Sequence, residues 1–139
     1  MYRAAGNLRL RGRARTRIFQ HFFSENIPKR RLRLIEGARI GVVIPCYKVT
    51  RHIMGVIQHI GPEVDIILCV DDACPDASGD FIEANCSDPR VKVLRNKRNR
   101  GVGGAVIRGY QEAIELNLDV VVKIDGDGQM DPTLLKQFA

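Results

Sequence analysis

Short apolar runs alternate with segments of helical periodicity from Arg39 onward. The apolar runs are rich in β-branched residues and predict buried strands at 40–44, 65–70, 91–94 and 119–124. Apolar residues three or four positions apart predict helices at 51–60, 76–84 and 103–116. Strands that are buried on both faces and alternate with helices predict a three-layer α/β fold with a mostly parallel sheet.

Three of the predicted helices carry specific expectations. Asp131-Pro132 pairs a preferred N-cap with proline at the first helical position, so a fourth helix is expected to begin there. The helix at 76–84 is expected to be capped by Asp76 or Ser78 and to bury Phe81 and Ile82. In the helix at 103–116 the spacing predicts one apolar face, formed by Val106, Ile107, Tyr110, Ala113 and Ile114.

Charge is distributed unevenly along the 139 residues. Residues 1–39 hold 11 basic and 2 acidic side chains, a net +9, whereas residues 40–139 hold 11 basic and 14 acidic side chains, a net −3. We therefore expect a basic, poorly ordered arm at 1–38 and a globular unit at 39–139. The arginines and phenylalanines of the arm also suit peripheral contact with a membrane surface. Nucleic-acid binding is less expected, because the globular part is slightly acidic.

The spacing of the cysteines argues against a zinc-binding protein, and the length of the apolar runs argues against a membrane-spanning one. Cys46, Cys69, Cys74 and Cys86 form no C-x-x-C pair and have no histidine at ligand spacing, so we do not expect a zinc site. Cys46 and Cys69 lie in or beside apolar runs and are expected in the core. No run approaches the roughly 20 apolar residues that cross a bilayer. We expect a cytoplasmic protein, with the inner face of the membrane as an alternative location.

Polar residues gather where three of the predicted strands end, at Pro45-Cys46-Tyr47, Asp71-Asp72 and Asp125-Gly126-Asp127-Gly128-Gln129. Ligands of parallel α/β sheets bind beyond the carboxyl ends of the strands, near a switch in strand order. Several carboxylates at one edge repel one another unless a cation joins them. In an extended segment the alternating side chains of Asp125, Asp127 and Gln129 face one point, as Mg²⁺ or Mn²⁺ requires. Gly126 and Gly128 would let a ligand approach the backbone closely.

Two other glycine- or acid-containing patterns are imperfect. Gly101-x-Gly103-Gly104 resembles a dinucleotide-binding loop, but Val106 stands at the third glycine position and the loop follows the third strand. It still forms a helix N-terminus that is open to anions, and the basic run 90–100 before it is either a solvated face or a phosphate contact. An EF-hand beginning at Asp125 fails, because Met130 and Lys136 occupy the glycine and glutamate positions.

Four collinear motifs resemble the nucleotide-sugar half of family-2 glycosyltransferases, and most closely the polyprenyl-phosphate (dolichyl-phosphate mannose synthase-like) branch. They are Val-Val-Ile-Pro-Cys-Tyr (42–47), Val-Asp-Asp-Ala-Cys-Pro-Asp (70–76), Asn-Arg-Gly-Val-Gly-Gly-Ala (99–105) and Lys-Ile-Asp-Gly-Asp-Gly-Gln-Met-Asp-Pro (123–132). Two positions depart from that branch. Val49 stands where a glutamate is frequent, and Ala73-Cys74 stands where Gly-Ser is usual.

The resemblance implies a GT-A fold, a nucleoside diphosphate-sugar donor, a Mg²⁺ or Mn²⁺ cofactor and, in this branch, a lipid-phosphate acceptor. It also implies residue roles. Pro45, Tyr47 and Val70 would line the base and ribose pocket, Asp72 would bind the base, and Asp71 would support the turn. Asp125 would meet the ribose or the water shell of the metal, while Asp127, with Gln129 as a further ligand, would bind the metal at the diphosphate.

The resemblance further implies that the chain is an N-terminal portion, with the acceptor wall and any catalytic base beyond Ala139. The basic arm, residues 1–38, has no assigned role. Alternatives to a transferase are a non-catalytic nucleotide-binding fragment or pseudoenzyme, a Rossmann-type dinucleotide-binding module, and a nucleic-acid-binding protein that acts through the basic arm.

Overall fold

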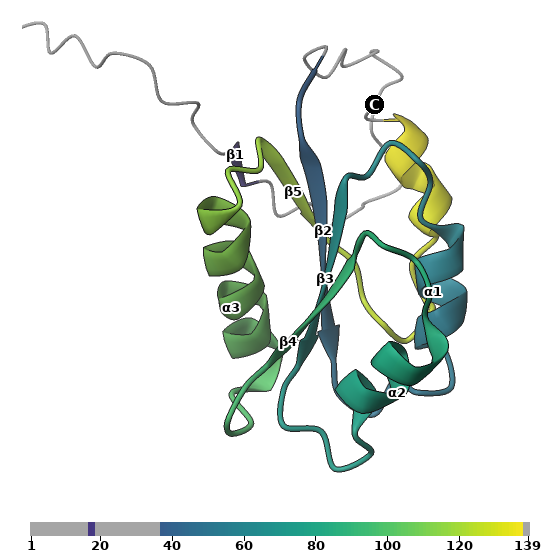
Figure 1. The fold of residues 1–139 in the computed structure, drawn as a ribbon, viewed down its shortest axis with the longest axis vertical. Coiled ribbons are helices and arrows are strands. Elements are labelled where there is room, and N and C mark those ends of the chain that lie inside the picture. Colours follow the sequence, from purple (N-terminus) through teal and green to yellow (C-terminus); the bar gives the residue numbers. More distant parts are fainter. Residues whose placement is uncertain (1–16, 19–36, 138–139) are drawn as a thin grey trace, which may run out of the picture.

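Five parallel strands form the central sheet of the protein in a computed structural model that describes residues 17–18 and 37–137 (Figure 1). The strands are β1 (Arg17–Ile18), β2 (Ile40–Cys46), β3 (Ile66–Asp71), β4 (Val91–Arg95) and β5 (Val120–Lys123). Their order across the sheet is β1-β5-β2-β3-β4. The helices are α1 (Ile53–His59), α2 (Ser78–Asn85), α3 (Gly101–Glu115) and the 3₁₀ helix η1 (Pro132–Gln137).

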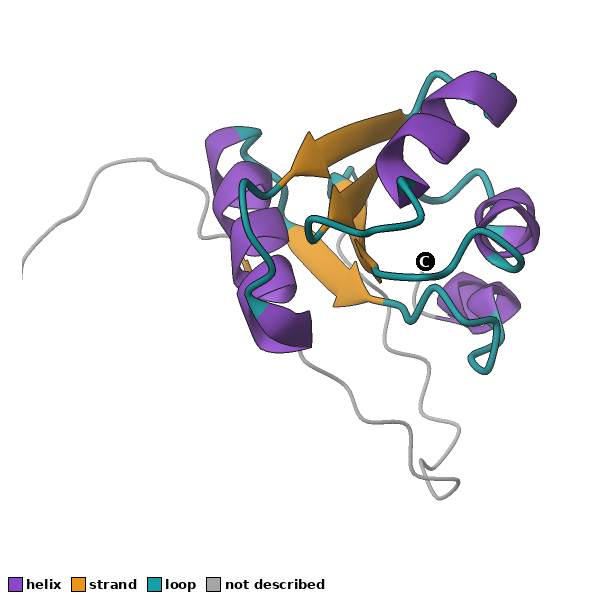
Figure 2. Ribbon diagram, turned by 90° about the horizontal axis from the view of Figure 1, so that it is seen from below, coloured by secondary structure: helices purple, strands orange, loops and turns teal. Residues whose placement is uncertain are grey.

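The helices cover both faces of the sheet, and this confirms the predicted three-layer α/β fold (Figure 2). One face packs against α1, α2 and η1, with Ile44, Ile57 and Ile82 in the apolar cluster between the layers. The opposite face packs against α3, with Val43 and Ala113 in a second cluster. Strands buried on both faces explain why the apolar runs were continuous rather than alternating. No helix in the described part of the chain has the length and apolar character to cross a bilayer.

The strand order reverses between β2 and β5. From β2 the chain proceeds outward through β3 to β4, and α3 then returns it to β5 on the other side of β2. The loops that follow β2 and β5 leave the same edge of the sheet and lead to α1 and η1 on one face, whereas the loop after β4 leads to α3 on the other face. The carboxyl ends of β2 and β5 therefore lie at the reversal of strand order, the usual ligand position in such sheets.

Helix α3 lies close to β2 because its contacting residues are small. A Cβ at Gly109 would overlap the side chain of Val43, so the glycine permits the approach. Ala105 and Ala113 are fully buried on the same side of α3. The predicted apolar face of this helix is therefore wrong in part: Ile107 and Ile114 are 59% and 52% exposed. Ile107 lies about 200° around the helix from Ala105 and so points away from the sheet.

The N-terminus of α2 also differs from the prediction. Its N-cap is Ala77, which has a left-handed φ of 48° and makes no side-chain capping bond, so neither Asp76 nor Ser78 caps the helix. Instead the Asp71 carboxylate at the end of β3 accepts the Gly79 N–H at 2.8 Å. A free N–H of the first turn is thus satisfied by a residue that is distant in sequence.

Two further differences from the expectations concern the turn after Asp131 and strand β1. Asp131 accepts the backbone N–H and the hydroxyl of Thr133 as predicted, but the turn that follows is the 3₁₀ helix η1 rather than an α-helix. Strand β1 was not predicted, because it lies inside the arm at 1–38 and pairs with Val120 and Val121 of β5. Apart from Gly37 and Ala38, the rest of the predicted arm lies outside the described residues.

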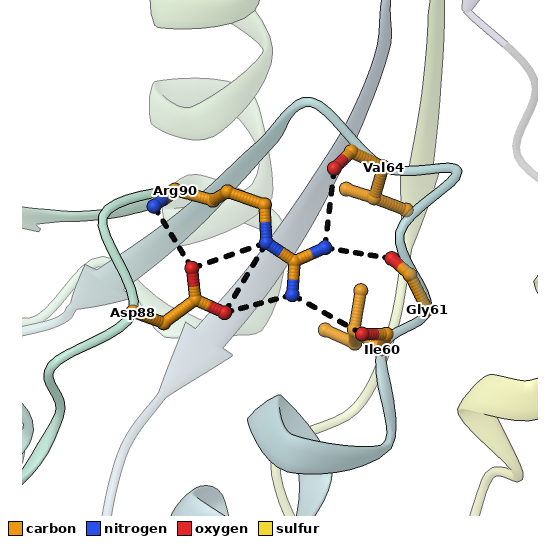
Figure 3. A network of polar contacts seen from close by, with 5 residues as sticks. All are labelled: Ile60, Gly61, Val64, Asp88 and Arg90. Carbon is orange, nitrogen blue, oxygen red and sulfur yellow. Dashed lines mark hydrogen bonds and ion pairs between the residues drawn. The ribbon is translucent and has the colours of Figure 1, made fainter.

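Arg90 links the loops at the amino ends of β3 and β4 through hydrogen bonds and an ion pair (Figure 3). Its guanidinium donates to the carbonyls of Ile60, Gly61 and Val64 at 3.2, 2.6 and 3.2 Å, and it pairs with Asp88 at 2.7 Å. Ile60 is the C-cap of α1, so the arginine satisfies carbonyls where that helix ends. Hydrogen bonding to Asp88, opposed by partial burial, raises the pKa of Arg90, and the same bonds lower the pKa of Asp88.

Candidate functional site

A hollow of about 390 Å³ opens beyond the carboxyl ends of β2 and β5, at the reversal of strand order. It brings together six residues that the sequence placed at a nucleotide site: Pro45, Tyr47, Asp72, Asp125, Gly126 and Asp127. It is also lined by Cys46, Val49, Asn99, Gly101, Val102 and Ala105. The acidic residues that follow β3 and β5 therefore open onto one shared space.

The end of β2 supplies an aromatic wall. Tyr47 is 42% exposed, and the Lys48 ammonium lies 5.7 Å from the centre of its ring. Pro45, two residues earlier, is buried like the rest of β2 and contributes to the lining of the hollow. An exposed tyrosine ring beside a proline offers the flat apolar surface against which an aromatic heterocycle stacks.

Asp72 is 3% exposed, and its carboxylate is held by groups of the segment that leads into α3. Its Oδ1 accepts the Asn96 amide at 2.7 Å, and the Arg100 backbone N–H lies 3.0 Å from both oxygens. Arg100 is the N-cap of α3. Asp72 therefore positions the start of this helix at the hollow, and its carboxylate keeps acceptor capacity for a ligand.

The first turns of α3 line the hollow with Gly101, Val102 and Ala105. Asn99 Oδ1 accepts the Gly101 N–H at 2.8 Å, while Gly101 itself has a φ of 74°, which glycine adopts without strain. The following N–H groups have no intrahelical partner, as in the first turn of any α-helix. A 15-residue helix thus directs its positive end toward the hollow. The helix start at Gly101-x-Gly103-Gly104 was predicted to be open to anions. No role was predicted for Asn99, although it begins the motif 99–105, or for Asn96, because a single asparagine gives no local signal.

The loop after β5 is a turn at Gly126-Asp127 and not the extended segment that the alternating pattern assumed. Asp125 and Asp127 still line the same hollow. Asp125 pairs with Lys123 at 2.5 Å, and Asp127 Oδ1 accepts the Gln129 N–H at 3.0 Å. Gln129 does not line this hollow and instead lines a second one of about 490 Å³ between α1 and η1.

Val70 and Asp71 lie outside the hollow. Val70 is fully buried in the cluster between the sheet and α3, so it lies behind the site rather than in its wall. Asp71 is 7% exposed and accepts the N–H groups of Cys74 and Gly79 at 2.8 Å each. It therefore supports the turn after β3, the position that the resemblance implies.

Two carboxylates, from Asp125 and Asp127, are the charged oxygen donors on one side of the hollow. Among residues 17–18 and 37–137, no three side chains of histidine, cysteine, aspartate or glutamate gather in a metal-binding cluster. A hard cation that takes one or two carboxylates and completes its shell with water and phosphate oxygens suits this donor set. The site therefore fits Mg²⁺ or Mn²⁺ better than a cation that needs an all-protein cage.

Comparison with known proteins shows the family of the chain. Residues 41–139 match the profile of glycosyl transferase family 2. The chain is 36% identical over 104 residues to the undecaprenyl-phosphate mannosyltransferase of Micrococcus luteus, covering 72% of this chain and 42% of the relative. It is 33% identical over 102 residues to the polyprenol monophosphomannose synthase of Mycolicibacterium smegmatis, covering 70% and 38%.

An archaeal relative shows the same relation. The dolichol-phosphate mannosyltransferase of Pyrococcus furiosus is 31% identical over 105 residues, covering 72% of this chain and 29% of the relative. The chain thus spans less than half the length of these relatives. The matched region contains β3, β4, β5, all of β2 except Ile40, and every residue that lines the hollow. By this match and by its α/β fold, the chain belongs to glycosyl transferase family 2.

Proposed function

We propose that this chain is the donor-binding half of a glycosyltransferase that uses a nucleoside diphosphate-sugar and Mg²⁺ or Mn²⁺. The observation that carries the proposal is the shared hollow, in which an aromatic wall, a helix N-terminus and two carboxylates face one space. A nucleoside diphosphate carries the matching groups: a flat base, a ribose and a charged diphosphate.

Each part of the hollow has a role in this proposal. Tyr47 and Pro45 stack against the base, and Asp72 accepts a hydrogen bond from it. The first turn of α3 offers N–H groups to the phosphates. Asp125 and Asp127 would hold the cation, and Lys123 keeps Asp125 oriented through their ion pair.

The chemistry to be supported is cleavage of the bond between the sugar and the diphosphate. Negative charge grows on the leaving diphosphate as that bond breaks. A bound divalent cation neutralises this charge as a Lewis acid. The two aspartates fix where that stabilisation acts, and the helix N-terminus adds to it without moving.

The acceptor that we propose is a polyprenyl phosphate, since the printed names of the relatives contain undecaprenyl phosphate, polyprenol and dolichol phosphate. A lipid phosphate is already anionic, so it needs a general base less than a hydroxyl acceptor does. We also propose a location at the cytoplasmic face of a membrane, where the arginines of the arm would meet anionic headgroups.

Titration calorimetry with UDP and GDP, each with and without Mn²⁺, tests the donor and the cation together. We expect heat of binding only in the presence of the metal. Asp127→Asn should weaken metal-dependent binding by about tenfold or more, because it removes one charged ligand. The matched control is Asp80→Asn, at a side chain on α2 that is 73% exposed and lies outside the hollow.

Equal metal-dependent affinity of the wild type and Asp127→Asn would refute the proposed metal site. Binding of NAD without metal, with UDP and GDP inactive, would favour the dinucleotide-binding alternative instead. Binding of neither nucleotide class would refute the donor site as a whole.

A further inference from the structure

The Cys74 sulfur joins two loops on one side of the hollow. It accepts the backbone N–H of Lys48 at 3.0 Å and the hydroxyl of Ser78 at 3.1 Å. Its own backbone N–H donates to Asp71 at 2.8 Å. The half-buried thiol thus connects the end of β2, which carries Tyr47, with the turn between β3 and α2.

Backbone strain is concentrated around this sulfur. Lys48, Ala73 and Ala77 have φ angles of 55°, 53° and 48°, in the left-handed region that favours glycine. Within the described residues, Asn117 is the one further non-glycine residue with positive φ. Such conformations cost free energy and persist only where the surroundings hold them, commonly at ligand sites. The bond from the Lys48 N–H to Cys74 is one of the contacts that holds the first of the three.

The strained backbone at Lys48 helps to determine the position of the Tyr47 ring in the hollow. Tyr47 immediately precedes Lys48 and lines the hollow with 42% of its surface exposed. Its position therefore depends in part on the backbone at 46–49. Release of the Lys48 N–H would let that φ relax toward the ordinary negative region and would carry the Tyr47 ring with it.

The electronic state of the sulfur agrees with its role as an acceptor. Desolvation by itself would raise the pKa of the Cys74 thiol, but the hydrogen bonds from Ser78, from the Lys48 N–H and from the Asp76 backbone together lower it. Electron density on the sulfur strengthens the hydrogen bonds that it accepts.

We infer that Cys74 is a positioning residue of the donor site: its sulfur holds the strained Lys48 backbone and thereby fixes the Tyr47 wall for the nucleotide base. The expected effect on nucleotide binding rests on the proposed function, whereas the contact between the Lys48 N–H and the Cys74 sulfur does not depend on it. It concerns a position where this chain departs from the Gly-Ser of the related branch, and serine there would offer a hydroxyl oxygen as the acceptor.

The test uses the full 139-residue chain with Cys74→Ala, Cys74→Ser and the matched control Cys86→Ala, at another half-buried cysteine, which lies after α2 and outside the hollow. The rate of hydrogen exchange of the Lys48 amide measures how firmly its N–H is bonded to the Cys74 sulfur, and no nucleotide is needed for this measurement. We expect about tenfold faster exchange in Cys74→Ala, near wild-type exchange in Cys74→Ser, and no change in Cys86→Ala.

Titration with UDP or GDP and Mn²⁺ then measures the effect of each substitution on nucleotide affinity. Cys74→Ala should bind about five- to tenfold more weakly, the loss of about one hydrogen bond, and serine should restore most of the affinity. If Cys74→Ala does not fold, Ser78→Ala removes one donor to the sulfur and should accelerate Lys48 exchange and weaken binding two- to threefold, roughly.

Unchanged Lys48 exchange in Cys74→Ala, or in Ser78→Ala where that variant replaces it, would overturn the inference. So would faster exchange with unaltered nucleotide affinity, because the loop would then not position the base. If the wild type binds no nucleotide, the proposed function fails, and Lys48 exchange still decides whether the sulfur holds the loop.

Discussion

Arg90→Met removes the guanidinium that joins the α1–β3 and α2–β4 loops and keeps most of the apolar stem. The carbonyls of Ile60, Gly61 and Val64 each lose the arginine as a donor, although Gly61 still accepts the Val64 N–H at 3.4 Å, and Asp88 loses its ion pair. The side chain is 25% exposed, so water replaces part of these bonds but not all.

The expected loss follows from the bonds removed. A hydrogen bond from a charged donor contributes about 1.5–3 kcal/mol when buried, and partial exposure lowers each contribution. For three such bonds and one partly exposed ion pair we expect a loss of about 3 kcal/mol in the free energy of unfolding. At a urea dependence of about 2 kcal/mol/M this lowers the unfolding midpoint by about 1.5 M.

Urea unfolding followed by circular dichroism measures this loss, with Arg95→Met as the matched control. Arg95 also pairs with two carboxylates, Asp80 and Glu83, but its side chain is 44% exposed and bonds no backbone carbonyl within residues 17–18 and 37–137. The control should therefore shift the midpoint far less. Equal shifts for the two variants, or a loss below about 1 kcal/mol for Arg90→Met, would refute the claim that the carbonyl bonds stabilise this end of the sheet.

Two further predictions concern packing and pH. Gly109→Ala should destabilise the folded protein by about 1–3 kcal/mol, because the added Cβ overlaps the Val43 side chain. Gly103→Ala should be neutral or slightly stabilising, because no described atom outside its own helix backbone lies within 4 Å of the added Cβ. Thermal unfolding of both variants measures the difference. Hydrogen bonds from Arg90 hold the folded-state pKa of Asp88 below its ordinary 3.8, so the unfolded chain takes up the proton first as the pH falls. Stability should therefore drop below about pH 4 in urea titrations, and Arg90→Met should flatten this drop; an identical acid limb in both proteins would contradict the assignment.

Most of the layered fold was predictable because strands buried on both faces leave unbroken apolar runs. What could not be predicted depends on contacts distant in sequence. The exposed positions of Ile107 and Ile114 follow from the small face that α3 turns to the sheet, and apolar spacing alone does not distinguish an alanine–glycine face from an isoleucine face. The N-terminus of α2 is served by Asp71, from the previous strand, which no local capping pattern reveals. Strand β1 has two residues and forms only beside the edge of β5.

The site was predictable to the extent that it lies at strand ends. The pattern of polar residues after the strands found the loops that form the hollow, because the carboxyl ends of parallel strands share one edge. It did not find the turn at Gly126-Asp127, after which Gln129 lines the second hollow. It also did not find Asn96, whose importance arises from its bond to Asp72 at the end of the neighbouring strand.

The central claim is that the nucleotide and the divalent cation occupy one hollow, between the turn at Gly126-Asp127 and the start of α3. Paramagnetic broadening of backbone amide signals by Mn²⁺, recorded with UDP or GDP present and absent, locates the cation directly. We expect the Gly126, Asp127 and Gly101 amides to broaden when metal and nucleotide are both present. Broadening that spares these amides and falls instead on His52 and His59 at the second hollow, whether or not nucleotide is added, would contradict the account.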